Sequence, residues 1–225
     1  DDHYVACIWR QLAERFADYD EHLIFESLNE PRLVGSAYEW NFVARNADCR
    51  EAAEAINRVN QAFVDTVRAA GGNNATRYLM VPAYDASPIY ACNEYFTLPT
   101  DPAESQRVMV SAHAYTHYNF AMDEKGVSGF TIPSGGKDID QFMDRLYSTF
   151  IVNGIPVVIG EFGARDKDNY QARVNFTAYY VASASARGMP VCWWDSNAFS
   201  GEGELLGLLR RRFGKWCWPE IVSAM

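Results

Sequence analysis

The sequence predicts an α/β protein built around a parallel sheet. Stretches typical of strands alternate with stretches typical of helices along all 225 residues, with no low-complexity segment or linker between them. The chain is 48% hydrophobic and 14% aromatic, so it can bury a sizeable core. Single α/β barrels commonly reach ~250 residues, and we therefore assign one domain over residues 1–225.

The first two elements are a helix over 4–17 and a strand over 23–29. The helix is predicted by apolar side chains at helical spacing, namely Val5, Ile8, Trp9, Leu12 and Phe16. The strand carries Leu23, Ile24 and Phe25 in the stretch "HLIFESLNEPR", and Pro31 ends it. Asn29 and Glu30 therefore occupy the tip of a buried strand.

A second helix follows, and its beginning and end are both marked. Asp48 followed by Glu51 resembles a capping box, and Gly71 and Gly72 stop the helix. Its apolar stripe consists of Ile56, Val59, Phe63 and Val67.

Four more strands are predicted at 77–82, 107–112, 156–160 and 190–194. Helices are predicted at 138–152 and 169–187, and 83–106 is predicted as a long, partly irregular loop. The total is five strands and about five helices. Five parallel strands cannot close an eight-stranded barrel, so the sheet is either an open doubly wound one or part of a barrel.

The composition argues against several classes of partner. The net charge is −9, from 20 basic and 29 acidic residues, and opposes binding to nucleic acid or to an anionic membrane. No apolar run approaches the ~20 residues of a transmembrane helix, and we expect a soluble chain whose amino terminus has been cut. The five cysteines lack CxxC spacing, which leaves one or two disulfides open but indicates no dense framework.

Polar and aromatic side chains follow the predicted strands where each strand ends. They are Asn29 and Glu30, Tyr84 and Asp85, His113 and Tyr115, Glu161, and Trp194 and Asp195. A single glutamate at a strand end is usually a loop ion pair or a helix cap. Because the carboxyl ends of parallel strands share one edge, five such ends together indicate a functional site.

Glu30 and Glu161 suggest the chemistry of that site. Two carboxylates from different strands suit glycoside hydrolysis, in which one protonates the leaving oxygen and the other attacks the anomeric carbon or activates water. Trp194 and Tyr115 offer flat apolar faces on which a sugar ring can stack, although core packing is the alternative for such aromatics.

Other kinds of site have little support. His113 and His117 have the spacing of a helical zinc pair, but residues 108–114 look like a strand, so we predict no metal. No serine lies in a GxSxG elbow, and no cysteine has a histidine partner at motif spacing. GxGxxG and GxxxxGK are absent, so nucleotide binding has no support.

The motifs resemble those of a known family. "LIFESLNEPR" resembles the acid/base signature of glycoside hydrolase family 5, and "HAYTHYNFA", "VVIGEFGARDKDN" and "WWDSNAF" resemble the segments that follow it there. "NQAFVDTVRAAGGNN" and "GELLGLL" are most similar to subfamily 4, which consists mainly of secreted endo-β-1,4-glucanases. The resemblance covers almost the whole chain.

This resemblance implies a (β/α)8 barrel, a retaining mechanism without a cofactor, a β-glucan substrate and a secreted protein. It implies that Glu30 is the general acid/base and Glu161 the nucleophile. Four substrate-binding residues are implied as well: Asn29, His113, Tyr115 and Trp194. In a retaining enzyme the two carboxyl groups lie ~5–5.5 Å apart.

The chain also departs from the family pattern. The "NEP" motif closes the fourth strand in the family, so we expect a partial barrel without strands one to three and without the early arginine and histidine of the site. Ser196 also replaces an asparagine that is usual in subfamily 4. Because a partial barrel leaves open edges, we expect completion by another copy, a separate amino-terminal piece or a domain swap.

The leading prediction is a retaining endo-β-1,4-glucanase. Two alternatives stay open: xyloglucanase, xylanase or mannanase specificity on the same scaffold, and a non-catalytic glucan-binding fragment.

Overall fold

The computed structural model describes residues 2–103 and 106–225. They form two compact units. The first contains the chain up to Ala112 together with Asn153–Val158, and the second contains His113–Val152 and Ile159–Met225. In the described residues no helix is both long and apolar enough to cross a bilayer.

The first unit contains three parallel strands and two long helices. The elements run α1 (Asp2–Arg15), β1 (Phe25–Glu26), α2 (Ala47–Ala69), β2 (Leu79–Pro82), α3 (Pro88–Ala91) and β3 (Val108–His113, with His113 assigned to the second unit). β1 pairs with β2 and β2 with β3, both in parallel register. Val110 N also donates to Pro156 O at 2.9 Å, which places the start of the next strand beside β3.

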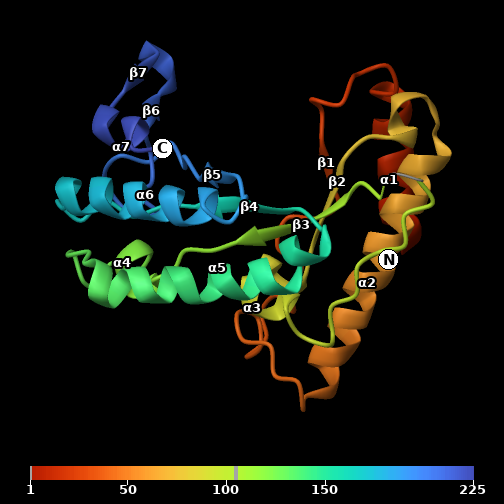
Figure 1. The fold of residues 1–225 in the computed structure, drawn as a ribbon, viewed down its shortest axis with the longest axis horizontal. Helices are drawn as coiled ribbons and strands as arrows, with labels where there is room; N and C mark the ends of the chain where they lie inside the picture. The colour runs from red at the N-terminus through yellow and green to blue at the C-terminus, as the bar shows by residue number, and fades with distance from the viewer. Residues whose placement is uncertain (1, 104–105) are drawn as a thin grey trace. The chain divides into compact units, whose positions relative to one another are not determined.

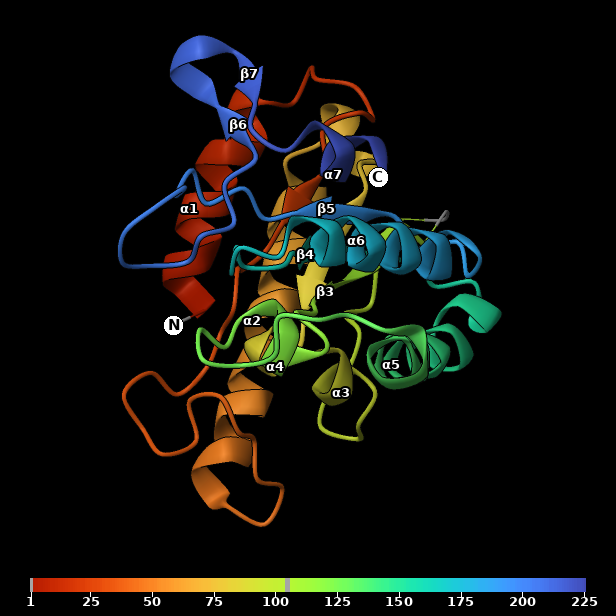
Figure 2. The ribbon, with the colours of Figure 1, turned by 90° about the vertical axis from the view of Figure 1, so that its left-hand side faces the viewer.

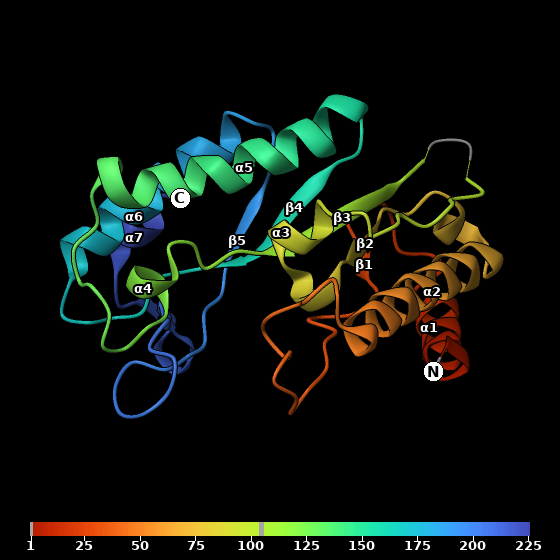
Figure 3. The same cartoon turned by 90° about the horizontal axis from the view of Figure 1, so that it is seen from below.

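The core of the first unit lies where the long helices meet the sheet. α1 and α2 lie side by side, as Figures 1 and 3 show. Trp9 of α1 packs against Phe25 of β1 and Phe63 of α2, with ring centroids 5.2 and 4.6 Å apart. Phe63 and Leu79 are fully buried there, so the apolar stripes read from the sequence cover the sheet.

The second unit contains the end of the sheet and the carboxyl-terminal elements. They are α4 (Tyr118–Ala121), α5 (Lys137–Thr149), β4 (Val157–Phe162), α6 (Tyr170–Ser185), β5 (Val191–Trp193), β6 (Leu209–Arg210), β7 (Lys215–Trp216) and α7 (Pro219–Ser223). β4 begins in the first unit and pairs in parallel with β5 in the second. Phe162 of β4 stacks on Tyr180 of α6, with centroids 4.4 Å apart.

Most of the predicted elements are confirmed, and the five strands follow chain order in their sheet. Three details were wrong. β1 covers only Phe25–Glu26, and β4 extends through Glu161 to Phe162 instead of stopping at 160. α2 is capped by Asn46, whose side chain accepts from Cys49 N at 3.0 Å, and not by a box of Asp48 and Glu51.

Several regions contain structure that the sequence did not predict, among them α4 and the two segments described next. The 83–106 segment, of which 104–105 lie outside the described residues, includes a short 3-10 helix (Tyr84–Ala86) and α3. Beyond β5 the chain forms the antiparallel β6–β7 hairpin and α7, which packs against α6 (Figure 2).

Candidate active site

Glu161 lies near the carboxyl end of β4, in the second unit, among hydrogen-bonding side chains. Tyr115 Oη donates to Glu161 Oε2 at 2.7 Å. His113 Nδ1 lies 3.5 Å from the same oxygen. The His113 side chain is 4% exposed and that of Glu161 15% exposed, so the carboxylate is largely shielded from water yet still open to it. Such an environment strengthens the hydrogen bonds that a carboxylate accepts.

Tyr115 and His113 are two positions apart on one segment, and both approach the same oxygen of Glu161. Ala114, between them, donates its N–H to Glu161 O at 2.9 Å, so the segment continues alongside β4. Tyr180 Oη of α6 donates to Ala114 O at 2.8 Å. Burial raises the pKa of Tyr180 well above its ordinary value, so this phenol stays a neutral donor. Helix α6 thus fixes the segment that carries both Glu161 partners.

Trp194 follows β5 and lies beside the end of β4. The backbone N–H of Trp194 donates to Phe162 O at 2.9 Å, and the residue is 43% exposed. Gly163 keeps this region closely packed, because a Cβ there would come 3.2 Å from Leu206 Cδ2. Trp194 therefore presents an indole to solvent, and its backbone is hydrogen-bonded to Phe162, the residue that follows Glu161 on β4.

The loop after Trp194 is held by Asp195. Its carboxylate accepts from the backbone N–H groups of Asn197, Leu208 and Leu209 at 3.0 to 3.1 Å. Burial by itself would raise the pKa of Asp195, but these three donors, helped by Arg211, bring that pKa below its usual value. Asp195 thus has an internal structural role.

Ser196 also holds this loop. Its Oγ donates to Glu204 O at 2.6 Å and accepts from Leu206 N at 3.2 Å. The serine that departs from the subfamily pattern therefore closes the loop on itself.

Asn29 and Glu30 lie in the first unit, in the segment that follows β1. Asn29 is exposed and Glu30 is partly buried. Arg32 turns back on Glu30: its Nη1 donates to Glu30 O at 2.8 Å and lies 3.6 Å from Glu30 Oε2. The Glu30 carboxylate is thus paired with a cation while 18% of its side chain is exposed.

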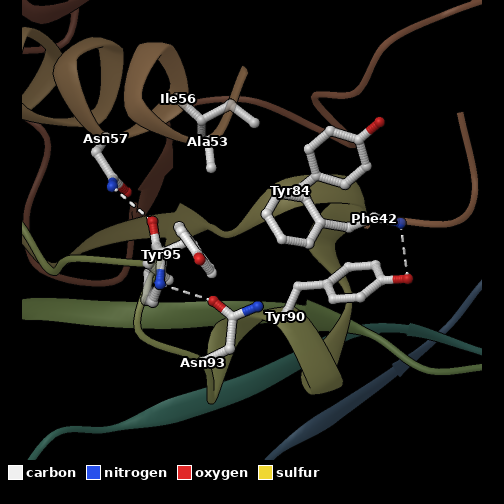
Figure 4. A pocket seen from close by; sticks show the side chains of 9 residues that line it. Phe42, Ala53, Ile56, Asn57, Tyr84, Tyr90, Asn93 and Tyr95 are labelled. Carbon is white, nitrogen blue, oxygen red and sulfur yellow. Dashed lines mark hydrogen bonds between the residues drawn. The ribbon is translucent and has the colours of Figure 1, made fainter. Parts of the chain in front are cut away.

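Two tyrosines hold the chain that follows Glu30. Tyr84 Oη accepts from Leu33 N at 3.0 Å and donates to Tyr38 O at 2.7 Å. Tyr90 Oη accepts from Phe42 N at 2.9 Å. Figure 4 shows Phe42 between Tyr84 and Tyr90, in the pocket that these rings line with Tyr95. This aromatic cluster is the satellite core beneath the 31–46 segment.

The structure brings three of the predicted residues, His113, Tyr115 and Glu161, into direct contact and places Trp194 next to β4. Asn29 and Glu30 are consecutive in the other unit. His113 and His117, which have the sequence spacing of a zinc pair, contact different carboxylates. His113 faces Glu161, and His117 Nδ1 lies 3.2 Å from Asp138 Oδ2.

Sequence reasoning missed Arg32. It ends the motif "LIFESLNEPR" but was given no role there, and its partners are a backbone oxygen and two glutamates of its own loop. Tyr84 was noted as a strand-end residue, but its part in holding the 31–46 segment depends on contacts about 50 positions away in sequence.

Relatives of known structure share this arrangement of elements. A family 5 lichenase from a Caldicellulosiruptor species, solved with cellotetraose, is 55% identical with a TM-score of 0.97, over 100% of this chain and 62% of that one. A subfamily 4 broad-specificity endoglucanase from Ruminococcus champanellensis, solved with cellotriose, is 44% identical with a TM-score of 0.92, over 100% and 63%. The fold is therefore that of a partial (β/α)8 barrel, and the open doubly wound sheet is excluded.

Curated relatives agree with the solved structures. Endoglucanase 1 of Ruminococcus albus is 42% identical over 97% of this chain and 51% of its own length. Endoglucanase B of Neocallimastix patriciarum is 41% identical over 98% and 45%. The chain thus spans about half the length of these relatives. The family model for cellulase, glycosyl hydrolase family 5, matches residues 1–200, and the chain belongs to that family.

Proposed function

We propose that this chain carries the two catalytic carboxylates of a retaining endo-β-1,4-glucanase. The observation that supports this most is the setting of Glu161, a largely shielded carboxylate that accepts a 2.7 Å hydrogen bond from Tyr115 and faces His113. A nucleophilic carboxylate must be held in one orientation, and these neighbours hold it. The membership in family 5 and the endoglucanase names of the relatives support the same proposal.

In the proposed reaction Glu161 attacks the anomeric carbon and forms a glycosyl ester. Glu30 gives its proton to the glycosidic oxygen as the bond to the departing chain breaks. Water then attacks the same carbon, gives a proton to Glu30 and releases Glu161 as a carboxylate. This double displacement requires ~5–5.5 Å between the two carboxyl groups.

The remaining predicted residues are proposed to bind the sugar. Trp194 offers its exposed indole as a platform for a glucose ring, because pyranose faces are apolar and flat. Asn29 is exposed beside the acid and is proposed to bind a sugar hydroxyl. We include mixed-linkage β-glucan among the substrates, since the 55% identical neighbour is named a lichenase. Action on a polymer also favours a secreted protein.

The test is release of reducing sugar from carboxymethylcellulose and barley β-glucan by this chain, compared with Glu161→Gln. We expect turnover by the chain and a loss of at least 10³-fold in the variant, because the amide cannot form the glycosyl ester. Glu54→Gln is the matched control, since Glu54 is exposed on α2, outside the segments that carry the site. Equal activity of the chain and Glu161→Gln would refute the assignment.

The alternatives predicted from the sequence have no specific observation in their favour. A panel containing xyloglucan, xylan and mannan tests the related specificities. Binding of glucan without product release would instead identify a non-catalytic fragment.

A further inference from the structure

Trp40 is a large aromatic side chain exposed close in sequence to Glu30. Its exposed fraction is 60%, one of the highest among the large apolar side chains of the described residues. The guanidinium carbon of Arg32 lies 3.9 Å from the centroid of its ring. A cation at that distance covers one face of the indole, and the exposed fraction leaves the other face to solvent.

Arg32 fixes this indole relative to Glu30. The same guanidinium donates from Nη1 to Glu30 O at 2.8 Å and from Nε to Glu39 Oε1 at 3.2 Å. Glu39 Oε2 in turn accepts from Gly35 N at 2.8 Å. Only 20% of the Arg32 side chain is exposed. The ring is therefore part of a closed network and not a free surface side chain.

The segment beneath the network is also anchored. Asp85 N donates to Pro31 O at 2.8 Å, and Tyr84 bonds to Leu33 and Tyr38 on the two sides of the loop. Phe42, two residues after Trp40, is buried in the aromatic cluster of Figure 4. An exposed apolar face held in this way has already lost most of the entropy that ligand binding would otherwise cost.

We propose that Trp40 is a binding platform for a glucose unit of the departing chain. The inference rests on the proposed function, in which Glu30 protonates the oxygen of the leaving sugar. Arg32 contacts both Trp40 and Glu30, so the indole lies near the acid and therefore near the sugar that leaves. Pyranose rings stack on indoles through their apolar C–H faces, and Arg32 holds the indole at a set distance from the acid.

The test compares substrates that do and do not place sugar on the departing side. Trp40→Ala is measured on cellohexaose and on 2,4-dinitrophenyl β-cellobioside, whose leaving group is a phenol. We expect kcat/KM on cellohexaose to fall about tenfold and kcat/KM on the aryl cellobioside to change less than twofold. Trp40→Phe should recover most of the loss. Trp216→Ala, at a tryptophan that is 51% exposed on β7, is the matched control and should change neither substrate.

Binding provides a readout that does not need turnover. In the Glu161→Gln background, calorimetry with cellohexaose should show Kd rising about tenfold on Trp40→Ala, and little change on Trp216→Ala. An unchanged Kd, or an equal loss of kcat/KM on both substrates, overturns the platform. Failure of the proposed function looks different, because the chain itself would then release no product while the binding comparison still decides the role of Trp40.

Discussion

Tyr115 Oη and Glu161 Oε2 are joined by a 2.7 Å hydrogen bond between the segment after β3 and the next strand, β4. Tyr180 holds the peptide at Ala114, directly before Tyr115, from the opposite side. The phenol is thus fixed by the backbone as well as by its partner. In the proposed mechanism the bond orients the carboxylate before attack and stabilises it again when the ester is hydrolysed.

Tyr115→Phe removes this donor and keeps the ring. We expect kcat/KM to fall about 10- to 100-fold on glucan and on aryl cellobioside alike, because a hydrogen bond to a charged group contributes about 1.5–3 kcal/mol. Tyr147→Phe, at an exposed tyrosine of α5, is the control. Unchanged kinetics with both substrates would show that the hydrogen bond has no part in the reaction.

Glu30→Ala should separate acid catalysis from nucleophilic attack. General acid catalysis contributes about 10²- to 10⁴-fold, so glucan hydrolysis should fall by about that factor. The first step on 2,4-dinitrophenyl β-cellobioside should remain fast, because this phenol leaves without a proton, and azide should restore turnover by replacing the water that Glu30 activates. Glu51→Ala, at an exposed glutamate of α2, should behave as the unchanged chain does. Loss of the same factor on both substrates would contradict the role of Glu30 as the acid.

The sequence was sufficient to predict the five strands of the main sheet and the place of Glu161 near the end of one of them. In the stretch "VVIGEF" of β4 the apolar residues Val157, Ile159 and Phe162 are buried, as expected for a strand of the core. Glu161 comes near the carboxyl end of this strand, and in a parallel sheet the carboxyl ends of the strands are where ligands bind. His113 follows the same logic at the end of β3.

The sequence was insufficient where one side chain chooses among partners of similar chemistry. Asn46 and Asp48 are both good helix caps, and the choice of Asn46 depends on where the preceding loop turns. Arg32 could have paired with any nearby acid, and its stacking on Trp40 follows from the loop that Tyr84 and Tyr90 hold. Contacts of this kind are set by tertiary packing, which local patterns do not encode.

Arg68 and Asp101 form a buried ion pair whose removal should destabilise the protein. Arg68 Nε and Nη2 lie 2.8 and 2.9 Å from the two carboxylate oxygens, and the side chains are 5% and 2% exposed. Breaking such a pair costs about 3–5 kcal/mol, because the remaining charge stays buried. Denaturant unfolding of Asp101→Asn at pH 7 should show a loss of about that size. Asp18→Asn, at an exposed position, should show almost none.

The same pair predicts how stability depends on pH. Burial alone would raise the pKa of Asp101, but the hydrogen bonds from Arg68, Ala103 and Arg107 bring that pKa below its ordinary value of 3.8. A lowered pKa in the folded state stabilises the protein above the unfolded value, and this contribution disappears as the pH falls through the folded pKa. The difference in unfolding free energy between the chain and Asp101→Asn should therefore shrink below pH 3.8. A constant difference from pH 7 to pH 3 would mean that Asp101 does not titrate with folding.

Asp195→Ala should loosen the loop behind Trp194. The carboxylate is the acceptor for the N–H groups of Leu208 and Leu209, so their amide hydrogen exchange should speed up at least tenfold in the variant. The amide of Val110 serves as the internal control and should exchange as before. It donates to Pro156 O, and both residues lie in the first unit, whereas Asp195 lies in the second. The pKa of Asp195 lies below its usual value, so acid should reproduce the effect only below pH 3.8.

Since Trp194 precedes this carboxylate directly, cellohexaose binding should weaken in parallel with the faster exchange. Fast exchange with unchanged binding would separate the loop from the sugar platform and confine Asp195 to stability.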